Sequence, residues 1–240
     1  NLSLRVLKKL NNGYHNIFSL ITFCQLHDII FITKNKDKKD KIIFSGDFKK
    51  GIDKKKNTIV KVLTLLRKKR LINKQTYKIK IIKNIPHGSG LGGGSANAAA
   101  LLNFFKSKMK LKISSKKLDL LAKKIGFDVP ISLEKKNTIL VGKGIQMIRL
   151  KKRFNLNVLL VYPNFSLSTK NIYKNNKKIS QKIIRTNINI KTQTDLINLL
   201  KKEQNDLQMT AIRIYPKIEK IINYIKLQNG CYFSRITGSG

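Results

Sequence analysis

The chain has 240 residues, of which 41% are hydrophobic, so it can form a hydrophobic core in one large domain or two smaller ones and is not disordered by composition. No apolar run approaches the roughly 18 residues that a membrane span needs. The two cysteines, Cys24 and Cys231, exclude a disulfide-dense scaffold and fall short of a four-ligand zinc site. The net charge is +39, from 51 lysines and arginines against 12 acidic residues.

The positive charge points either to an anionic partner or to a biased composition. Of the 51 basic residues, 43 are lysines spread along the whole chain, and asparagine (23) and isoleucine (34) are also abundant. Nucleic-acid surfaces usually rely on arginine and stacking aromatic rings. We therefore interpret the charge as the drift of an A/T-rich genome and do not expect a nucleic-acid partner.

In chain order, the alternation of Leu2, Leu4 and Val6 predicts a strand, followed by a hairpin turn at Asn12-Gly13 and an extended stretch over 17–33. The lysine-rich residues 34–56 are expected to form a solvated hairpin with short strands around 42–44. Helical spacing predicts a helix over 58–71, and alternation predicts a strand over 77–82. A glycine loop over 86–94 then leads into a helix of small residues over 95–105.

Further along, the spacing predicts a helix over 114–125, capped by Ser114 or Ser115, and strands over 138–141 and 146–150. The basic residues 151–153 mark an expected domain boundary. Beyond it the sequence predicts a buried strand over 156–162, a polar stretch with little periodicity over 163–195, helices over 196–200, 206–213 and 217–227, and a final strand over 231–236. The pattern indicates a mixed α+β fold with two domains, 1–150 and 151–240.

The most informative segment is 85–102, IPHGSGLGGGSANAAALL, between a predicted strand and a predicted helix. Its five glycines (Gly88, Gly90, Gly92, Gly93 and Gly94) let backbone N–H groups approach a ligand closely, and the following helix directs its positive end to the same place. Together these features predict a polyphosphate site, to which Ser95 can add a hydroxyl for a phosphate or a bound Mg²⁺.

Other interpretations of the glycine segment fit less well. Gly88-x-Gly90-x-x-Gly93 matches the dinucleotide-binding pattern, which also requires an acidic residue about 20 positions later, at the end of a second strand. The only nearby acid is Asp119, and it lies on a segment predicted to be helical. The P-loop pattern fails because no Gly-Lys-Ser/Thr follows the glycines. A merely flexible loop is the remaining alternative.

Residues 86–96 resemble the second motif of the GHMP kinase superfamily, P-x-G-x-G-L-G-[SG]-[SG]-[SA]. The three glycines 92–94 with SANAA after them are similar to the branch that phosphorylates a cytidine-diphosphate methylerythritol in the non-mevalonate route to isoprenoids. Other stretches that match in order are 1–6, 12–15, 126–130, 205–207 with 215–216, and 236–240.

The resemblance implies a two-domain GHMP kinase fold of the α+β class. Its amino-terminal domain would resemble domain 2 of ribosomal protein S5, and its carboxy-terminal domain would be ferredoxin-like. It also implies ATP and Mg²⁺ as cofactors, a cytidyl diphosphate compound as small-molecule partner, a cytoplasmic location away from membranes, and a monomer or homodimer. Because the chain starts at Asn1 and stops at Gly240 inside a glycine motif, we expect a fragment cut at both ends.

The resemblance also implies roles for individual residues. Asp128 would be the catalytic base, and Asn1 would lie at the reaction centre, with a catalytic lysine expected just upstream of the chain. The resemblance assigns no individual role to the His87 side chain. It assigns ATP binding to the whole segment Pro86, His87, Gly88, Ser89, Gly90, Leu91, Gly92, Gly93, Gly94, Ser95 and Ala96. Substrate binding falls to Tyr14, His15, Lys83, Tyr173, Thr237 and Gly238, with Tyr173 stacking on the cytosine. The resemblance does not identify the metal ligands, although the Ser95 hydroxyl can contact a Mg²⁺ ion that is bound to ATP.

Without the resemblance, each of these residues has an ordinary explanation. Asp128 is equally a solvated aspartate at a helix end, His15 a surface residue after a turn, and Lys83 one solvated lysine among many. The competing functions are another GHMP kinase, acting on homoserine, mevalonate or galactose, and a basic RNA-binding protein. RNA binding through many lysines weakens steeply with salt, whereas turnover saturates with ATP and a cytidyl compound, so these two functions can be distinguished.

Overall fold

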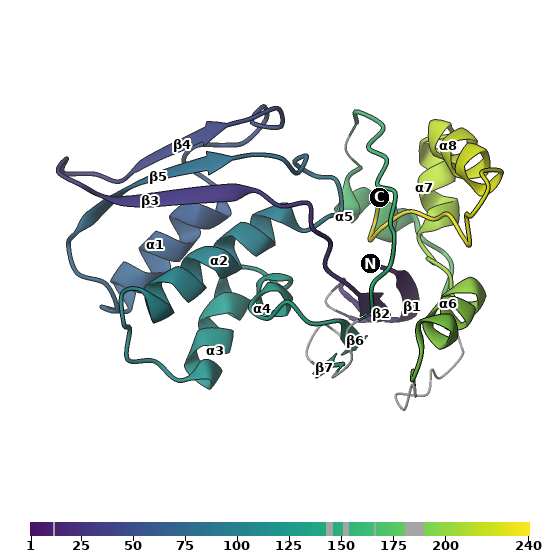
Figure 1. The fold of residues 1–240 in the computed structure, drawn as a ribbon, viewed down its shortest axis with the longest axis horizontal. Coiled ribbons are helices and arrows are strands. Elements are labelled where there is room, and N and C mark those ends of the chain that lie inside the picture. The colour runs from purple at the N-terminus through teal and green to yellow at the C-terminus, as the bar shows by residue number, and fades with distance from the viewer. Residues whose placement is uncertain (12, 143–145, 151–153, 166, 181–189) are drawn as a thin grey trace. The chain divides into compact units, whose positions relative to one another are not determined.

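The computed structural model describes residues 1–11, 13–142, 146–150, 154–165, 167–180 and 190–240 (Figure 1). The chain forms two compact units. Unit 1 comprises Asn1–Phe23, Gly88–Leu91 and Lys136–Gly240, and unit 2 comprises Cys24–His87 and Gly92–Lys135. The expected boundary at 151–153 lies outside the described residues, and the domain limits 1–150 and 151–240 stay a prediction.

Unit 1 contains an antiparallel sheet of four strands in the order β1-β2-β6-β7. The strands are β1 (Ser3–Lys9), β2 (His15–Ile21), β6 (Thr138–Gly142) and β7 (Gln146–Arg149). The alternation that predicted β1 places Leu4 and Val6 in one buried cluster, while Phe18 and Leu20 of β2 enter another. Both faces of this sheet are therefore covered by apolar side chains.

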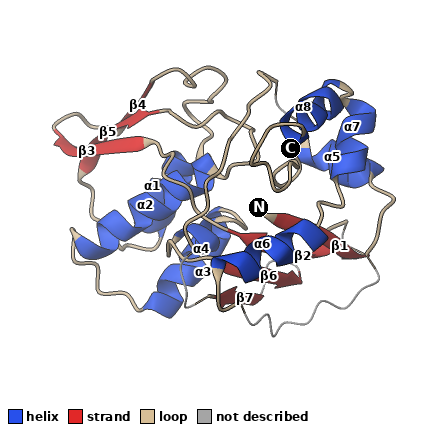
Figure 2. Ribbon diagram, turned by 45° about the vertical axis from the view of Figure 1, so that its right-hand side comes forward, coloured by secondary structure: helices blue, strands red, loops and turns tan. Residues whose placement is uncertain are grey.

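The helices of unit 1 supply those two clusters. They are α5 (Thr169–Asn175), α6 (Gln193–Lys202), α7 (Gln208–Ile214) and α8 (Lys217–Lys226). Leu196 and Leu200 of α6 pack with Phe18 and Leu20, and α6 lies along the sheet in Figure 2. The other three helices pack against Leu4 and Val6. The two faces of the sheet thus meet different helices.

Unit 2 contains a three-stranded sheet in the order β3-β5-β4, with β3 antiparallel and β4 parallel to the central strand. The strands are β3 (Ile29–Asn35), β4 (Lys41–Ser45) and β5 (Thr76–Ile82), and the helices are α1 (Thr58–Lys68), α2 (Gly93–Ser107), α3 (Ser115–Ile125) and α4 (Val129–Ser132). Helices α1 and α2 lie beneath the sheet (Figure 1), and their apolar faces form one core with Ile79 and Ile81 of β5.

Local signals placed the starts of α1 and α3 to within one residue, whereas α2 begins at Gly93, two residues before its predicted start. Asn57 caps α1 by accepting hydrogen bonds from the N–H groups of Ile59 and Val60. Ser114 caps α3 by accepting a hydrogen bond from Lys117 N. Of the two predicted caps, Ser114 is therefore the one that is confirmed. The β5 alternation is also confirmed, because Tyr77, Ile79 and Ile81 are buried.

Several expectations are wrong. The extended stretch over 17–33 is interrupted, with residues 22–28 outside any strand. Residues 156–162 and 231–236 form no strand, and residues 158–161 are exposed rather than buried. A strand needs a partner for its backbone hydrogen bonds, and no strand of the described residues pairs with either segment.

Two short helices also differ from expectation. The polar stretch after residue 163 contains α5, which begins after Ser168, whose side chain caps it through Asn171 N. No helix is expected over 129–132, yet Val129 and Pro130 begin α4, because proline suits the first helical turn. Among the helices of the described residues, none combines the length and apolar character required to cross a membrane.

Candidate active site

The glycine loop passes along the chain from unit 1 into unit 2, where α2 begins at Gly93. Gly88, Gly90 and Gly92 have φ angles of +71°, +69° and +69°, in the left-handed region that favours glycine. Gly92, the N-cap residue of α2, has no side chain with which to cap the first turn. The N–H groups of that turn are therefore presented at the positive end of a 15-residue helix, where an anion is stabilised.

The start of α2 packs closely against its neighbours in unit 2. A Cβ atom at Gly93 would lie 2.9 Å from Ile85 Cγ2, so only glycine allows this approach. The hydroxyl of Thr58 donates to the carbonyl oxygen of Gly94 at 2.8 Å. The exit of β5 and the start of α1 thus hold the first turn of α2.

Lys83 lies beneath this turn, buried and ion-paired with Asp28. The same carboxylate accepts hydrogen bonds from Asn84 N at 2.8 Å, Ile85 N at 2.9 Å and Asn97 Nδ2 at 2.8 Å. The expectation of a solvated lysine is therefore wrong, and the substrate-binding role of Lys83 stays a prediction. Asp28 and Asn97 are not among the residues predicted from the sequence, although an acid in so acid-poor a chain and an asparagine among the alanines of α2 are signals that the sequence contains.

Asp128 directly precedes α4, at the end of the turn that follows α3. Val129 N donates to Gly126 O at 3.2 Å, which closes this turn and fixes the aspartate's backbone. The residue is exposed, yet desolvation by the protein atoms around it raises the pKa of its carboxyl above the ordinary aspartate value. A raised pKa brings a carboxylate nearer to the range useful for a general base.

Two residues predicted to hold a nucleobase come together in unit 1. The rings of His15, at the start of β2, and Tyr173, on α5, have centroids 5.0 Å apart and are tilted by 33°. Burial lowers the pKa of the His15 imidazole, and the charge of Lys9 acts in the same direction. The ring is therefore neutral at neutral pH, with one nitrogen to donate and one to accept a hydrogen bond. Tyr14, beside it in sequence, is largely exposed.

Asn1 meets the segment at the other end of the chain. Its side chain donates to Ser19 Oγ at 2.7 Å, and its backbone nitrogen donates to Thr237 Oγ1 at 2.7 Å. A Cβ at Gly238 would lie 3.2 Å from Asn1 Oδ1, and one at Gly90 would lie 2.7 Å from the Thr237 carbonyl. The structure thus brings four predicted site residues, Asn1, Gly90, Thr237 and Gly238, into one cluster.

Asn205 holds the 236–238 segment in place. Its side-chain nitrogen donates to the carbonyl oxygens of Ile236 at 3.0 Å and Gly238 at 2.7 Å, and its side-chain oxygen accepts from Leu207 N at 3.0 Å. From the sequence, Asn205 is part of a matching motif and has no predicted role. Its contacts with Ile236 and Gly238 span more than 30 residues of sequence, so no local pattern could have shown them.

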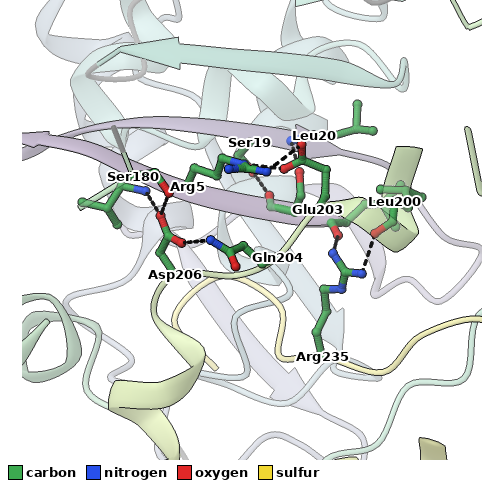
Figure 3. Close-up of polar contacts among 12 residues, drawn as sticks. Arg5, Ser19, Leu20, Ser180, Leu200, Glu203, Gln204, Asp206 and Arg235 are labelled. Carbon is green, nitrogen blue, oxygen red and sulfur yellow. Dashed lines mark hydrogen bonds and ion pairs between the residues drawn. The ribbon is translucent and has the colours of Figure 1, made fainter. Parts of the chain in front are cut away.

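The adjacent Asp206 links the residues that precede α7 to β1 (Figure 3). This buried carboxylate accepts from Val6 N at 2.8 Å, Ser180 Oγ at 2.7 Å and Gln204 Nε2 at 2.7 Å. On the same strand, Arg5 forms a two-point ion pair with Glu203, at 2.7 and 3.1 Å. These contacts anchor the strand that follows Asn1.

The remaining predicted positions lie in or beside the loop. Pro86 is buried, His87 is exposed, and Ser89 and Leu91 are half-buried. Ser95 is half-buried in the first turn of α2, followed by Ala96. Across the described ranges, no group of three or more His, Cys, Asp or Glu side chains could hold a metal ion.

Comparisons with known proteins agree with this architecture. A model of the family "GHMP kinases N terminal domain" matches residues 57–136, which include the glycine loop, α2 and Asp128. A crystal structure of 4-(cytidine 5'-diphospho)-2C-methyl-D-erythritol kinase superposes with a TM-score of 0.67 at 21% identity, over 94% of this chain and 79% of that one. Fold and loop together define a small-molecule kinase of the GHMP class.

Sequence relatives narrow this class. The chain is 38% identical to the 4-diphosphocytidyl-2-C-methyl-D-erythritol kinase of Pelagibacter ubique, over all of this chain and 83% of that protein. It is 33% identical to the same kinase of Petrotoga mobilis, over all of this chain and 93% of that protein. The chain belongs to the 4-diphosphocytidyl-2-C-methyl-D-erythritol kinase family.

Proposed function

We propose that this protein transfers the γ-phosphoryl group of ATP to the 2-hydroxyl of 4-diphosphocytidyl-2-C-methyl-D-erythritol, in the non-mevalonate route to isoprenoid precursors. The observation that carries the phosphoryl-transfer step is the start of α2, where three left-handed glycines lead to an uncapped helix end. Such an end binds phosphate through backbone N–H groups. The cytidyl substrate is supported by the two kinases named above.

In this proposal the glycine segment holds the ATP phosphates, and Asp128 takes the proton of the attacked hydroxyl. The hydroxyl oxygen forms a bond to the γ-phosphorus, the bond from that phosphorus to the β,γ-bridging oxygen breaks, and ADP leaves. Phosphoryl transfer depends mainly on positioning and on stabilising the charge of the transferred group. The raised pKa of Asp128 supports its role as base.

Recognition of the cytidyl group is assigned to His15 and Tyr173. An aromatic ring offers a stacking surface for a pyrimidine, and a neutral imidazole offers one donor and one acceptor to the base edge. The ring contact between the two residues supports this pairing of roles. Asn1, Thr237 and Gly238 are assigned to the methylerythritol end, and Lys83 is left out because its ammonium is paired with Asp28.

Mg²⁺ is proposed to enter with ATP, where it neutralises charge on the β- and γ-phosphates. Ser95 is the residue proposed to add a hydroxyl contact, since it lies in the first turn of α2. A cytoplasmic location and a monomer or homodimer complete the proposal.

The test is ADP release by the full-length protein with 4-diphosphocytidyl-2-C-methyl-D-erythritol, homoserine and mevalonate offered separately. Turnover with the cytidyl compound alone is expected, and Asp128→Asn should abolish it. Turnover with homoserine or mevalonate alone would indicate another GHMP kinase. Turnover with none of the three would contradict the proposal.

A further inference from the structure

Asp28 is a buried acid for which the reaction described above has no use. Its side chain is fully buried, and its two oxygens receive four donors: Lys83 Nζ, Asn97 Nδ2 and the backbone nitrogens of Asn84 and Ile85. A buried carboxylate needs such compensation, because an unpaired buried charge is costly. The arrangement is therefore a complete polar network inside unit 2.

The four donors come from two segments that flank the glycine loop. Lys83, Asn84 and Ile85 follow the end of β5, immediately before the loop, whereas Asn97 lies on α2, immediately after it. Asp28 itself precedes β3, the antiparallel neighbour of β5. One carboxylate thus joins the chain entering the loop to the helix leaving it.

The network also reaches the backbone of the first turn of α2. Ile85, whose N–H binds Asp28, has its Cγ2 atom 2.9 Å from the place where a Cβ of Gly93 would stand. Lys83 Nζ lies 3.5 Å from that same place. Asn97 is four residues further along α2, one turn of helix from Gly93. A shift of this network would displace the N–H groups of the turn.

We propose that Asp28 is a positioning residue for nucleotide binding, which fixes the first turn of α2 relative to the end of β5 through Asn97, Ile85 and Lys83. This inference rests on the proposed function, in which that turn binds the ATP phosphates. Lys83 serves here as the counter-ion of Asp28 and not as a ligand of substrate. The contact that matters most is the hydrogen bond from Asn97, because it is the network's link to α2.

The first experiment compares two asparagines of the same helix. Asn97→Ala removes the link to Asp28 and leaves the ion pair with Lys83 intact. Asn103→Ala is the matched control, since Asn103 is also on α2 and donates one hydrogen bond, to Leu133 O at 3.1 Å. Asn103 lies ten residues beyond Gly93, about 15 Å along the helix.

Asn97→Ala should raise the KM for ATP about tenfold, because small misplacements of binding groups have large kinetic effects. The KM for the cytidyl substrate should stay within about twofold. Asn103→Ala should leave both KM values unchanged. Equal KM values for ATP in the two variants, at comparable thermal stability, would overturn the proposal.

The second experiment separates positioning from direct binding by Lys83. Asp28→Asn should weaken ATP binding, because the new amide nitrogen would face the ammonium of Lys83 and the amide of Asn97, which are both donors. The double variant Asp28→Asn with Lys83→Met removes the Lys83 ammonium. The side-chain amide of Asn97 can then rotate, so that its oxygen accepts a hydrogen bond from the side-chain nitrogen of the new asparagine. The double variant should therefore bind ATP better than Asp28→Asn alone. Weaker binding by the double variant would mean that Lys83 contacts the nucleotide, and would overturn the proposal.

Isothermal titration of each variant with a non-hydrolysable ATP analogue keeps this inference distinct from the proposed function. If the unaltered protein binds the analogue but does not phosphorylate the cytidyl compound, the proposed substrate is wrong, and the comparison of Asn97→Ala with Asn103→Ala still decides the role of Asp28. If the unaltered protein binds no analogue, both proposals fail.

Discussion

Replacement of Gly90 by alanine tests whether the glycine loop lies against the 237–240 segment as the structure has it. Gly90 has a φ of +69°, and an added Cβ would lie 2.7 Å from the carbonyl oxygen of Thr237 and 3.3 Å from that of Gly240. Ordinary contacts of a Cβ begin at 3.4 Å. Both obstructing atoms belong to the backbone, so the two segments must separate for alanine to fit.

The cost has two parts that the chain allows to be measured separately. A left-handed alanine costs about 1–2 kcal/mol relative to glycine, and forcing an extra methyl group into packed structure costs about 1–3 kcal/mol. Gly90→Ala should therefore lower the free energy of unfolding by about 2–5 kcal/mol. Gly142, at the end of β6, also has a left-handed φ of +78°, but no described atom lies within 4 Å of an added Cβ. Gly142→Ala should therefore show only the cost of a left-handed alanine.

The assay is urea denaturation of the two variants and the unaltered protein, with the KM for ATP measured on each. Alanine also restricts the unfolded chain, but equally at both positions, so this effect cancels in the comparison. Gly90→Ala should be the less stable variant by about 1–3 kcal/mol, and it alone should raise the KM for ATP. Equal stability of the two variants would refute the close approach of the loop to Thr237.

Four further predictions concern the proposed catalytic and recognition residues. Asp128→Asn should abolish turnover and leave nucleotide affinity unchanged. With the native aspartate, kcat should fall at acid pH with a midpoint above about 4, because desolvation raises the pKa of the base. Tyr173→Ala should raise the KM for the cytidyl substrate about 5- to 150-fold, from a stacking contribution of about 1–3 kcal/mol, without changing that for ATP. That same KM should also rise as pH falls through the lowered pKa of His15, below about 6.5, because the protonated ring can no longer accept.

The stability of Asp128→Asn offers a separate check on the same pKa. A pKa that is higher in the folded than in the unfolded chain means that the folded state binds the proton more tightly. The resulting stability is fully present below the unfolded pKa and is lost as pH rises through the folded one. At neutral pH the carboxylate therefore adds no stability by this route, and the asparagine variant should unfold at no lower urea concentration. A less stable Asp128→Asn variant would contradict the raised pKa of Asp128. Retained turnover in the same variant would contradict its role as the base. A raised KM for ATP in Tyr173→Ala would contradict the assignment of Tyr173 to the cytidyl group.

Local signals in the sequence determined much of unit 2. Helical spacing placed α1, spacing and the predicted cap Ser114 placed α3, and strict alternation placed β5. The glycine loop before a helix of small residues was recognisable because its chemistry depends on residues adjacent in sequence. Family membership followed from the same segment and from motifs in matching order.

Strands were predicted less well where pairing decides the outcome. Residues 156–162 and 231–236 carry the apolar residues of strands, yet neither has a partner strand among the described residues. Helix α5 begins at a serine cap inside a stretch without clear periodicity, and its Ile172 is buried by residues far away in sequence. A helix of seven residues depends on such packing more than on its own propensity.

The sequence by itself therefore indicated the fold class, which depends on short-range patterns, and the resemblance of its motifs to a known family supplied the candidate residues, whose roles stay predictions. Only the tertiary structure showed that Lys83 is the buried partner of Asp28, 55 residues away, that Asn205 holds Gly238, 33 residues away, and that His15 meets Tyr173. Such contacts join residues distant along the chain, and their energy depends on burial and on the geometry of each donor and acceptor. Neither quantity exists until the chain has folded.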